Sequence, residues 1–160
     1  MLTLTSKTIT RTLLGFLMAA AAMSVFAGSP MKMVATGPDN VAIKGYDTVA
    51  YFTEGQAMKG ESKFVASWND AEWHFANVAH RDLFTTNPER YAPQFGGFCA
   101  NGLSKEFKGV KVAADPEAWT IVDGKLYIKF SKGARDRWRK DKAEKIKEAE
   151  ESWAKYQKQN

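Results

Sequence analysis

The sequence predicts a small α+β domain with two short β-hairpins, short helices and a long C-terminal helix. Residues 63–68 alternate between apolar and polar side chains, and a short return at 73–76 follows a turn. Residues 119–130 contain two β-rich runs joined by Asp-Gly, a dipeptide typical of two-residue hairpin turns. From Ser131 to about Gln157 an apolar rhythm of helical period runs through a highly charged segment.

The chain begins with a segment typical of a secretory signal peptide. A basic stretch precedes the apolar run of residues 13–26, and the run ends at Ala27 with residues that a signal peptidase accepts. The run is shorter than the ~20 residues needed to span a bilayer, so an uncleaved anchor is the less favoured alternative. We therefore expect residues 1–27 to be removed and the mature protein to be periplasmic.

Residues 28–40 contain two glycines, two prolines and little periodicity, and we expect a flexible leader there. The folded part then begins at Val41. Asn77 is a suitable N-cap for a helix over 78–85. Asn87 followed by proline indicates a second short helix, which ends near Tyr91.

The positive charge of the chain is concentrated near its C-terminus. Residues 129–160 carry 11 Lys and Arg against 6 Asp and Glu, whereas residues 28–128 carry 10 against 12. We expect the charged face of the last helix to be solvated. Contact with anionic lipid or a protein partner is the alternative, and the export signal argues against a nucleic-acid partner.

The strong nitrogen and sulfur ligands of the chain are His74, His80 and Cys99. In an oxidising compartment a lone cysteine must be buried, liganded, paired with a second chain as in a homodimer, or reactive. A thiolate with an imidazole suits copper or zinc better than magnesium or calcium. A four-ligand structural zinc site lacks residues here, and no histidine follows the cysteine as a blue-copper site requires.

The predicted elements bring His80 and Cys99 within reach of one another. We expect His80, Leu83 and Phe84 to share one helix face. Cys99 follows a Gly-Gly turn that lets the backbone approach a neighbouring element closely. His74 lies on the opposite face of its strand from two aromatic residues, so it faces solvent or the last helix.

Five segments in order resemble the secreted bacterial branch of the YHS domain family, and the resemblance covers residues 40 to 153. They read GYDTVAYF at 45–52, WxF at 73–75, HRDxF at 80–84, NPExY at 87–91 and YAPQFGGFCA at 91–100. The resemblance continues through DPEAW at 115–119 and DGKLY at 123–127. The resemblance implies a treble-clef-like metal-binding domain at 41–130. Residues 131–160 would form a helix packed on that domain or extending from it.

The family's metal-binding members carry three cysteines whose positions correspond here to Ala50, Ala76 and His80, with Asp47 matching a family aspartate. Since two of those sulfurs are missing, the resemblance implies either a remodelled metal site or none. We expect the remodelled site to consist of Cys99, His80 and Asp47 and to bind copper, with zinc as the alternative ion.

Together these observations predict an exported small protein that binds or traffics metal and meets a periplasmic or membrane metal-handling protein. Two alternatives remain open. One is a non-enzymatic interaction module that has lost the family metal site. The other is a thiol-redox protein that uses Cys99 as nucleophile and His80 as base. No third group that would orient the histidine is recognisable in the sequence, so an enzyme is the less favoured reading.

Overall fold

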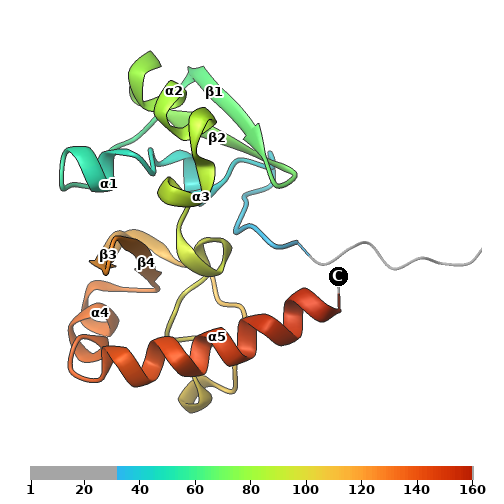
Figure 1. Ribbon diagram of the computed structural model, residues 1–160, viewed down its shortest axis with the longest axis vertical. Coiled ribbons are helices and arrows are strands. Elements are labelled where there is room, and N and C mark those ends of the chain that lie inside the picture. Colours follow the sequence, from blue (N-terminus) through green and yellow to red (C-terminus); the bar gives the residue numbers. More distant parts are fainter. Residues whose placement is uncertain (1–31, 160) are drawn as a thin grey trace, which may run out of the picture.

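The computed structural model describes residues 32–159, which form two lobes (Figure 1). The expected signal peptide, residues 1–27, lies outside this range. The elements are, in order, η1 (Ile43–Gly45), α1 (Ala50–Thr53), β1 (Glu61–Trp68), β2 (Ala71–Phe75), α2 (Val78–Thr86), α3 (Pro88–Tyr91), η2 (Gln94–Gly97), η3 (Lys105–Phe107), β3 (Asp115–Val122), β4 (Lys125–Lys129), α4 (Lys132–Trp138) and α5 (Lys142–Lys158). The α+β prediction is confirmed. None of the helices within residues 32–159 has the length and apolar content to cross a bilayer.

The upper lobe in Figure 1 is built on the first predicted hairpin. β1 and β2 pair antiparallel, and Asn69 and Asp70 make the turn between them with positive φ angles. β2 buries Trp73 and Phe75, whose rings both lie 5.0 Å from the ring of Phe84 in α2. The alternation predicted for these strands therefore points their aromatic residues at α2.

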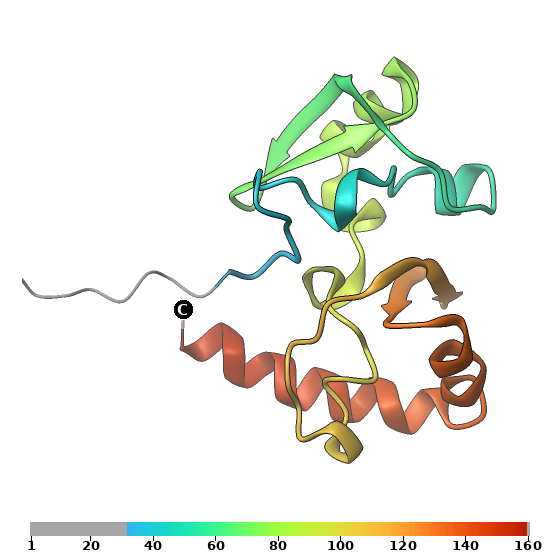
Figure 2. The ribbon, with the colours of Figure 1, turned by 180° about the vertical axis from the view of Figure 1, so that it is seen from behind.

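The lower lobe contains the second hairpin and the last two helices. β3 and β4 pair antiparallel, and the Asp-Gly turn adopts positive φ at both residues, as the dipeptide predicts. Ser131 caps α4 by accepting a hydrogen bond from the backbone N–H of Ala134 at 3.2 Å. α5 runs along the base of this lobe in both views (Figures 1 and 2).

β4 is shared by two hydrophobic cores. Leu126 and Ile128 belong to the upper core, whereas Tyr127 packs in a lower core with Trp138 of α4. Because side chains alternate across a strand, residue 129 lies on the same side as Tyr127. The residue there is Lys129, and it is fully buried.

Residues 32–40, expected within a flexible leader, are part of the fold. Val34 is buried in the upper core. The N–H of Ala35 donates to the carbonyl of Gly96 at 2.8 Å, and the N–H of Ile43 donates to the carbonyl of Ala35 at 3.0 Å. Sequence patterning missed this segment because it is held by backbone hydrogen bonds to distant residues rather than by a periodic apolar face.

The single long helix predicted from Ser131 is instead two helices, with a break at residues 139–141. Trp138 must remain in the lower core, while α5 packs its own apolar stripe against the same core at a later point. That stripe consists of Ile146, Ala149, Trp153 and Tyr156. Tertiary packing therefore overrides a local sequence that favours continuous helix.

Both predicted helix caps are confirmed: the side chain of Asn77 accepts a hydrogen bond from His80 N–H, and that of Asn87 from Arg90 N–H. The expected helix face is correct only in part. His80 and Phe84 are buried, but Leu83 is 41% exposed. The apolar stripe of α2 is thus narrower than the sequence predicted.

Gly96 lies close against the N-terminal segment. Its φ is +60°, and a Cβ on this residue would overlap the carbonyl of Met33. Gly124 in the second hairpin has a similar φ of +72° but nothing within 4 Å of the Cβ position. Substitutions at Gly96 and Gly124 can therefore distinguish two contributions to the loss of stability: backbone conformation, which affects both positions, and steric overlap, which affects only Gly96.

We expect Gly96→Ala to lower the free energy of unfolding by about 3 kcal/mol or more, because conformational strain and overlap add. Gly124→Ala should lower it by about 1 kcal/mol, from conformation alone. Urea denaturation of both variants measures the difference. If both variants lost the same free energy of unfolding, overlap with Met33 would make no contribution to the effect of Gly96→Ala.

Lys129 lies in the lower core with little polar compensation. Its Nζ donates to the carbonyl of Tyr127 at 3.1 Å and lies 3.6 Å from the ring centroid of Trp138. The pKa of Lys129 falls from 10.5 to about 7, chiefly because of burial; Cys99 opposes this shift, and Arg139 and Arg135 contribute to it. Near neutral pH the folded protein therefore gives up a proton that the unfolded chain retains.

Because the unfolded chain binds more protons than the folded one above pH 7, the free energy of unfolding should rise from pH 7 to about 9. The slope should reach up to roughly 1 kcal/mol per pH unit. Lys129→Met should abolish the rise, whereas Lys125→Met, at the exposed start of the same strand, should retain it. Denaturation at several pH values tests this, and an unchanged slope in Lys129→Met would refute it.

Candidate functional site

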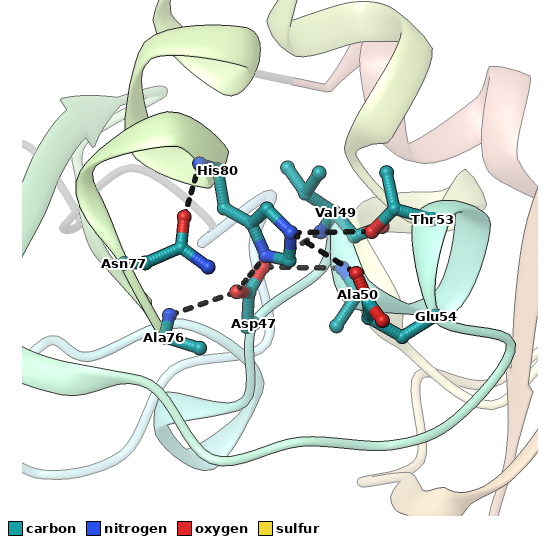
Figure 3. Close-up of polar contacts among 8 residues, drawn as sticks. All are labelled: Asp47, Val49, Ala50, Thr53, Glu54, Ala76, Asn77 and His80. Carbon is teal, nitrogen blue, oxygen red and sulfur yellow. Dashed lines mark hydrogen bonds and ion pairs between the residues drawn. The ribbon is translucent and has the colours of Figure 1, made fainter.

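The carboxylate of Asp47 is fully buried and accepts four hydrogen bonds (Figure 3). Oδ1 accepts from the backbone N–H of Val49 at 2.9 Å and of Ala50 at 3.3 Å. Oδ2 accepts from the N–H of Ala76 at 2.8 Å and from Nδ1 of His80 at 2.6 Å. Each oxygen thus uses both lone pairs, which leaves none for a metal ion.

Local sequence signals bring these partners together. Asp47 precedes α1 and accepts from the N–H groups of Val49 and Ala50, a local bonding pattern that aspartate commonly makes at turns. Asn77 caps α2 and accepts from the N–H of His80 at 2.8 Å, which fixes His80 in the first turn. Three segments, the start of α1, the residue after β2 and the first turn of α2, therefore meet at one carboxylate.

The second ring nitrogen of His80 points away from Asp47 toward the end of α1 (Figure 3). Nε2 lies 3.2 Å from Oγ1 of Thr53 and 3.7 Å from Oε1 of Glu54. Since Nδ1 donates to Asp47, the neutral ring carries its free lone pair on Nε2. Thr53 can direct its hydroxyl proton to the carbonyl of Val49 at 3.2 Å, so Nε2 need not accept it.

Tyr51 anchors α1 to the lower lobe and so holds Thr53 and Glu54 in place. Its hydroxyl donates to the carbonyl of Pro116 at 2.9 Å, and its ring lies 5.1 Å from that of Trp119. Burial raises the pKa of Tyr51, which keeps the phenol protonated as a donor. The Nε2 side of the His80 ring is therefore bordered by a fixed element.

Cys99 does not join Asp47 and His80. It is fully buried, its N–H donates to the carbonyl of Val112 at 2.9 Å, and the next residue, Ala100, donates to Ile128 of β4. Within residues 32–159 no three His, Cys, Asp or Glu side chains are placed to hold a metal ion. The expected three-ligand site is thus not formed: Asp47 orients His80 instead of facing an ion, and Cys99 packs beside β4.

The positions that the predicted YHS resemblance assigns to cysteine ligands all contact Asp47. Ala50 and Ala76 donate through their backbone N–H groups, and His80 donates through Nδ1. Two of these side chains are methyl groups and cannot ligate. The three-position arrangement implied by the resemblance therefore does not fit a metal ion, and a hydrogen-bonded carboxylate joins the three segments.

His74 is separate from this site and bonds to Glu72 at 2.7 Å. Sequence reasoning missed Thr53 and Glu54. A signal was present, because Thr53 and Glu54 lie about one helical turn after the N–H groups that bond to Asp47, the partner of His80.

An imidazole oriented by a buried carboxylate can accept a proton or coordinate a metal at its free nitrogen. Comparison of this chain with protein-family models, with curated proteins and with solved structures finds no match. The chemistry of the site therefore rests on its own geometry.

We expect Asp47→Asn to lower the free energy of unfolding by about 2–4 kcal/mol, because an amide group would face two donors. Asp82→Asn is the matched control: Asp82 is 62% exposed and its pair with Arg81 lies at the surface, so the loss should stay below about 0.5 kcal/mol. Urea denaturation measures both. If both variants lost a similarly small free energy of unfolding, the hydrogen bonds of Asp47 would contribute little to stability.

Proposed function

We propose that the chain is an exported small metal-binding protein that holds a divalent ion, Cu²⁺ ahead of Zn²⁺, on Nε2 of His80. The observation that supports this is the 2.6 Å bond from Nδ1 to the buried Asp47 carboxylate. Histidine ligands commonly donate their other N–H to a carboxylate, which fixes the tautomer and makes the ligating nitrogen more basic. Asp47 is then a positioning residue and not a ligand.

Glu54 is the second protein ligand in this proposal. Its carboxylate lies 3.7 Å from Nε2, and its side chain is 46% exposed and free to close on an ion. Imidazole with carboxylate suits Cu²⁺ and Zn²⁺, and at such sites Cu²⁺ binds more tightly. Without Cys99 there is no thiolate to favour Cu⁺. Water or a partner supplies the remaining ligands.

Such a site suits the transfer of metal rather than its storage. Two protein ligands leave coordination positions open, so an incoming ligand can join before the ion departs. Glu54 lies at the exposed end of α1, where another protein can approach. The partner we propose is a periplasmic or membrane metal-handling protein.

The second candidate function is a metal-free interaction module, and the hydrogen bonds of Ala50 and Ala76 to Asp47 favour it. They connect segments that a metal would connect in the arrangement implied by the resemblance. A thiol-redox function has the least support, because Cys99 has no exposed surface from which to attack a substrate.

The proposal predicts one Cu²⁺ per chain with ligand nitrogen visible by electron paramagnetic resonance. His80→Gln should abolish this binding, and Asp47→Asn should weaken it about 10- to 100-fold by freeing the ring. Glu54→Gln should weaken it about tenfold. Isothermal titration provides the affinities, which should fall at acidic pH because protons compete for Nε2.

Cys99→Ala is the matched control and should bind as tightly as the unaltered chain. Circular dichroism confirms that each variant is folded. If the folded unaltered chain takes up neither Cu²⁺ nor Zn²⁺, the metal proposal fails and the interaction module becomes the better account. If Cys99→Ala loses binding while His80→Gln retains it, the site has been placed wrongly.

A further inference from the structure

α4 turns a concentrated set of cations toward solvent. Ala134 and Trp138 are its buried residues, Arg135 is half-buried, and the other residues of the helix are exposed. Residues 132–142 carry six basic side chains and two aspartates. We call the basic side chains, together with Phe130, the α4 corner: Phe130, Lys132, Arg135, Arg137, Arg139, Lys140 and Lys142.

The charge of the α4 corner is only partly neutralised. Asp136 lies 3.0 Å from Arg135 and 3.9 Å from Arg139, and Lys132 lies 3.9 Å from Glu117. Three exposed cations have no carboxylate within 4 Å in the described part of the chain: Arg137, Lys140 and Lys142.

An exposed aromatic residue precedes the helix that carries these cations. Phe130 directly precedes the α4 cap and is 45% exposed, while its neighbour Lys129 points into the core. Nη1 of Arg137 lies 3.7 Å from the position that a Cβ on Gly133 would take. The guanidinium therefore lies back along the first turn of α4, toward the end of the helix that Phe130 precedes.

The α4 corner is held rigidly and projects from the molecule. Trp138 packs on Tyr127 at a ring distance of 5.6 Å and covers Nζ of Lys129 at 3.6 Å. Both views place α4 and the start of α5 at an outer corner of the lower lobe (Figures 1 and 2). A projecting corner suits an extended partner surface better than it suits a small ligand.

We propose that the α4 corner docks the protein on an anionic membrane surface. Unpaired cations attract anionic headgroups, and an exposed phenylalanine just before the same helix gains by entering the interfacial layer. Residues 102–160 carry 15 Lys and Arg against 10 Asp and Glu, whereas residues 32–101 carry 6 against 8. This asymmetry turns the lower lobe toward the lipid and leaves His80 on the other lobe.

The test is cosedimentation of the full chain with phosphatidylcholine vesicles and with vesicles that contain about 30% phosphatidylglycerol. The apolar run of residues 13–26 contributes to binding of both vesicle types. The difference in binding between the two types therefore measures the attraction to anionic headgroups. Arg137→Glu with Lys140→Glu should lower binding to the anionic vesicles about tenfold or more. Phe130→Ser should lower it roughly fivefold.

Lys155→Glu with Lys158→Glu is the matched control, since it makes the same charge change at exposed positions on the far end of α5. It should change binding less than twofold, and roughly 0.5 M salt should remove the anionic preference of the unaltered chain. If both double variants lost binding to the anionic vesicles equally, net charge alone would explain the binding and the proposal would be overturned. The absence of an anionic preference, or binding to double-stranded DNA but not to vesicles, would also overturn it.

Discussion

The buried carboxylate of Asp47 is the constraint on which the arrangement of the upper lobe depends. An ionised group without solvent is costly unless donors surround it, and here four donors come from three separate segments. If any one segment moved away, the buried carboxylate would lose hydrogen bonds and the folded state would be destabilised. One side chain therefore fixes the direction of α1, the exit from β2 and the first turn of α2. Orienting the His80 ring is a consequence of the same bonds.

Asp47 and Lys129 are both fully buried, and the protein compensates their charges differently. Asp47 has a full set of hydrogen bonds, whereas Lys129 has one carbonyl and the face of Trp138. A group with few partners responds by changing its protonation, and the pKa of Lys129 is low for that reason. Asp47 therefore specifies geometry, while Lys129 makes the stability of the lower lobe sensitive to pH.

Features encoded over a few neighbouring residues were predictable from the sequence. The Asp-Gly hairpin, the alternation that buries Trp73 and the caps at Asn77 and Asn87 each depend on local chemistry. The break after Trp138 was not predictable, because it arises from packing against β4. The position of Cys99 likewise depends on a backbone hydrogen bond to Val112, and the residues around Cys99 in the sequence do not predict that bond. Within the site, the pairing of Asp47 with His80 could be proposed but its role as an orienting group could not.

The short N-terminal segment joins the two lobes through its backbone hydrogen bonds, and that of Ala35 is the clearest. Ala35 pairs with Ile43 on the upper-lobe side and donates its N–H to Gly96 in η2, which contacts β4. Because β4 contributes to both hydrophobic cores and Tyr51 bonds to Pro116, movement of one lobe against the other must break this bond together with those contacts. The amide proton of Ala35 is thus a natural reporter of motion between the lobes. Its hydrogen-exchange rate, compared with that of amides inside β4, would separate sub-global opening from complete unfolding.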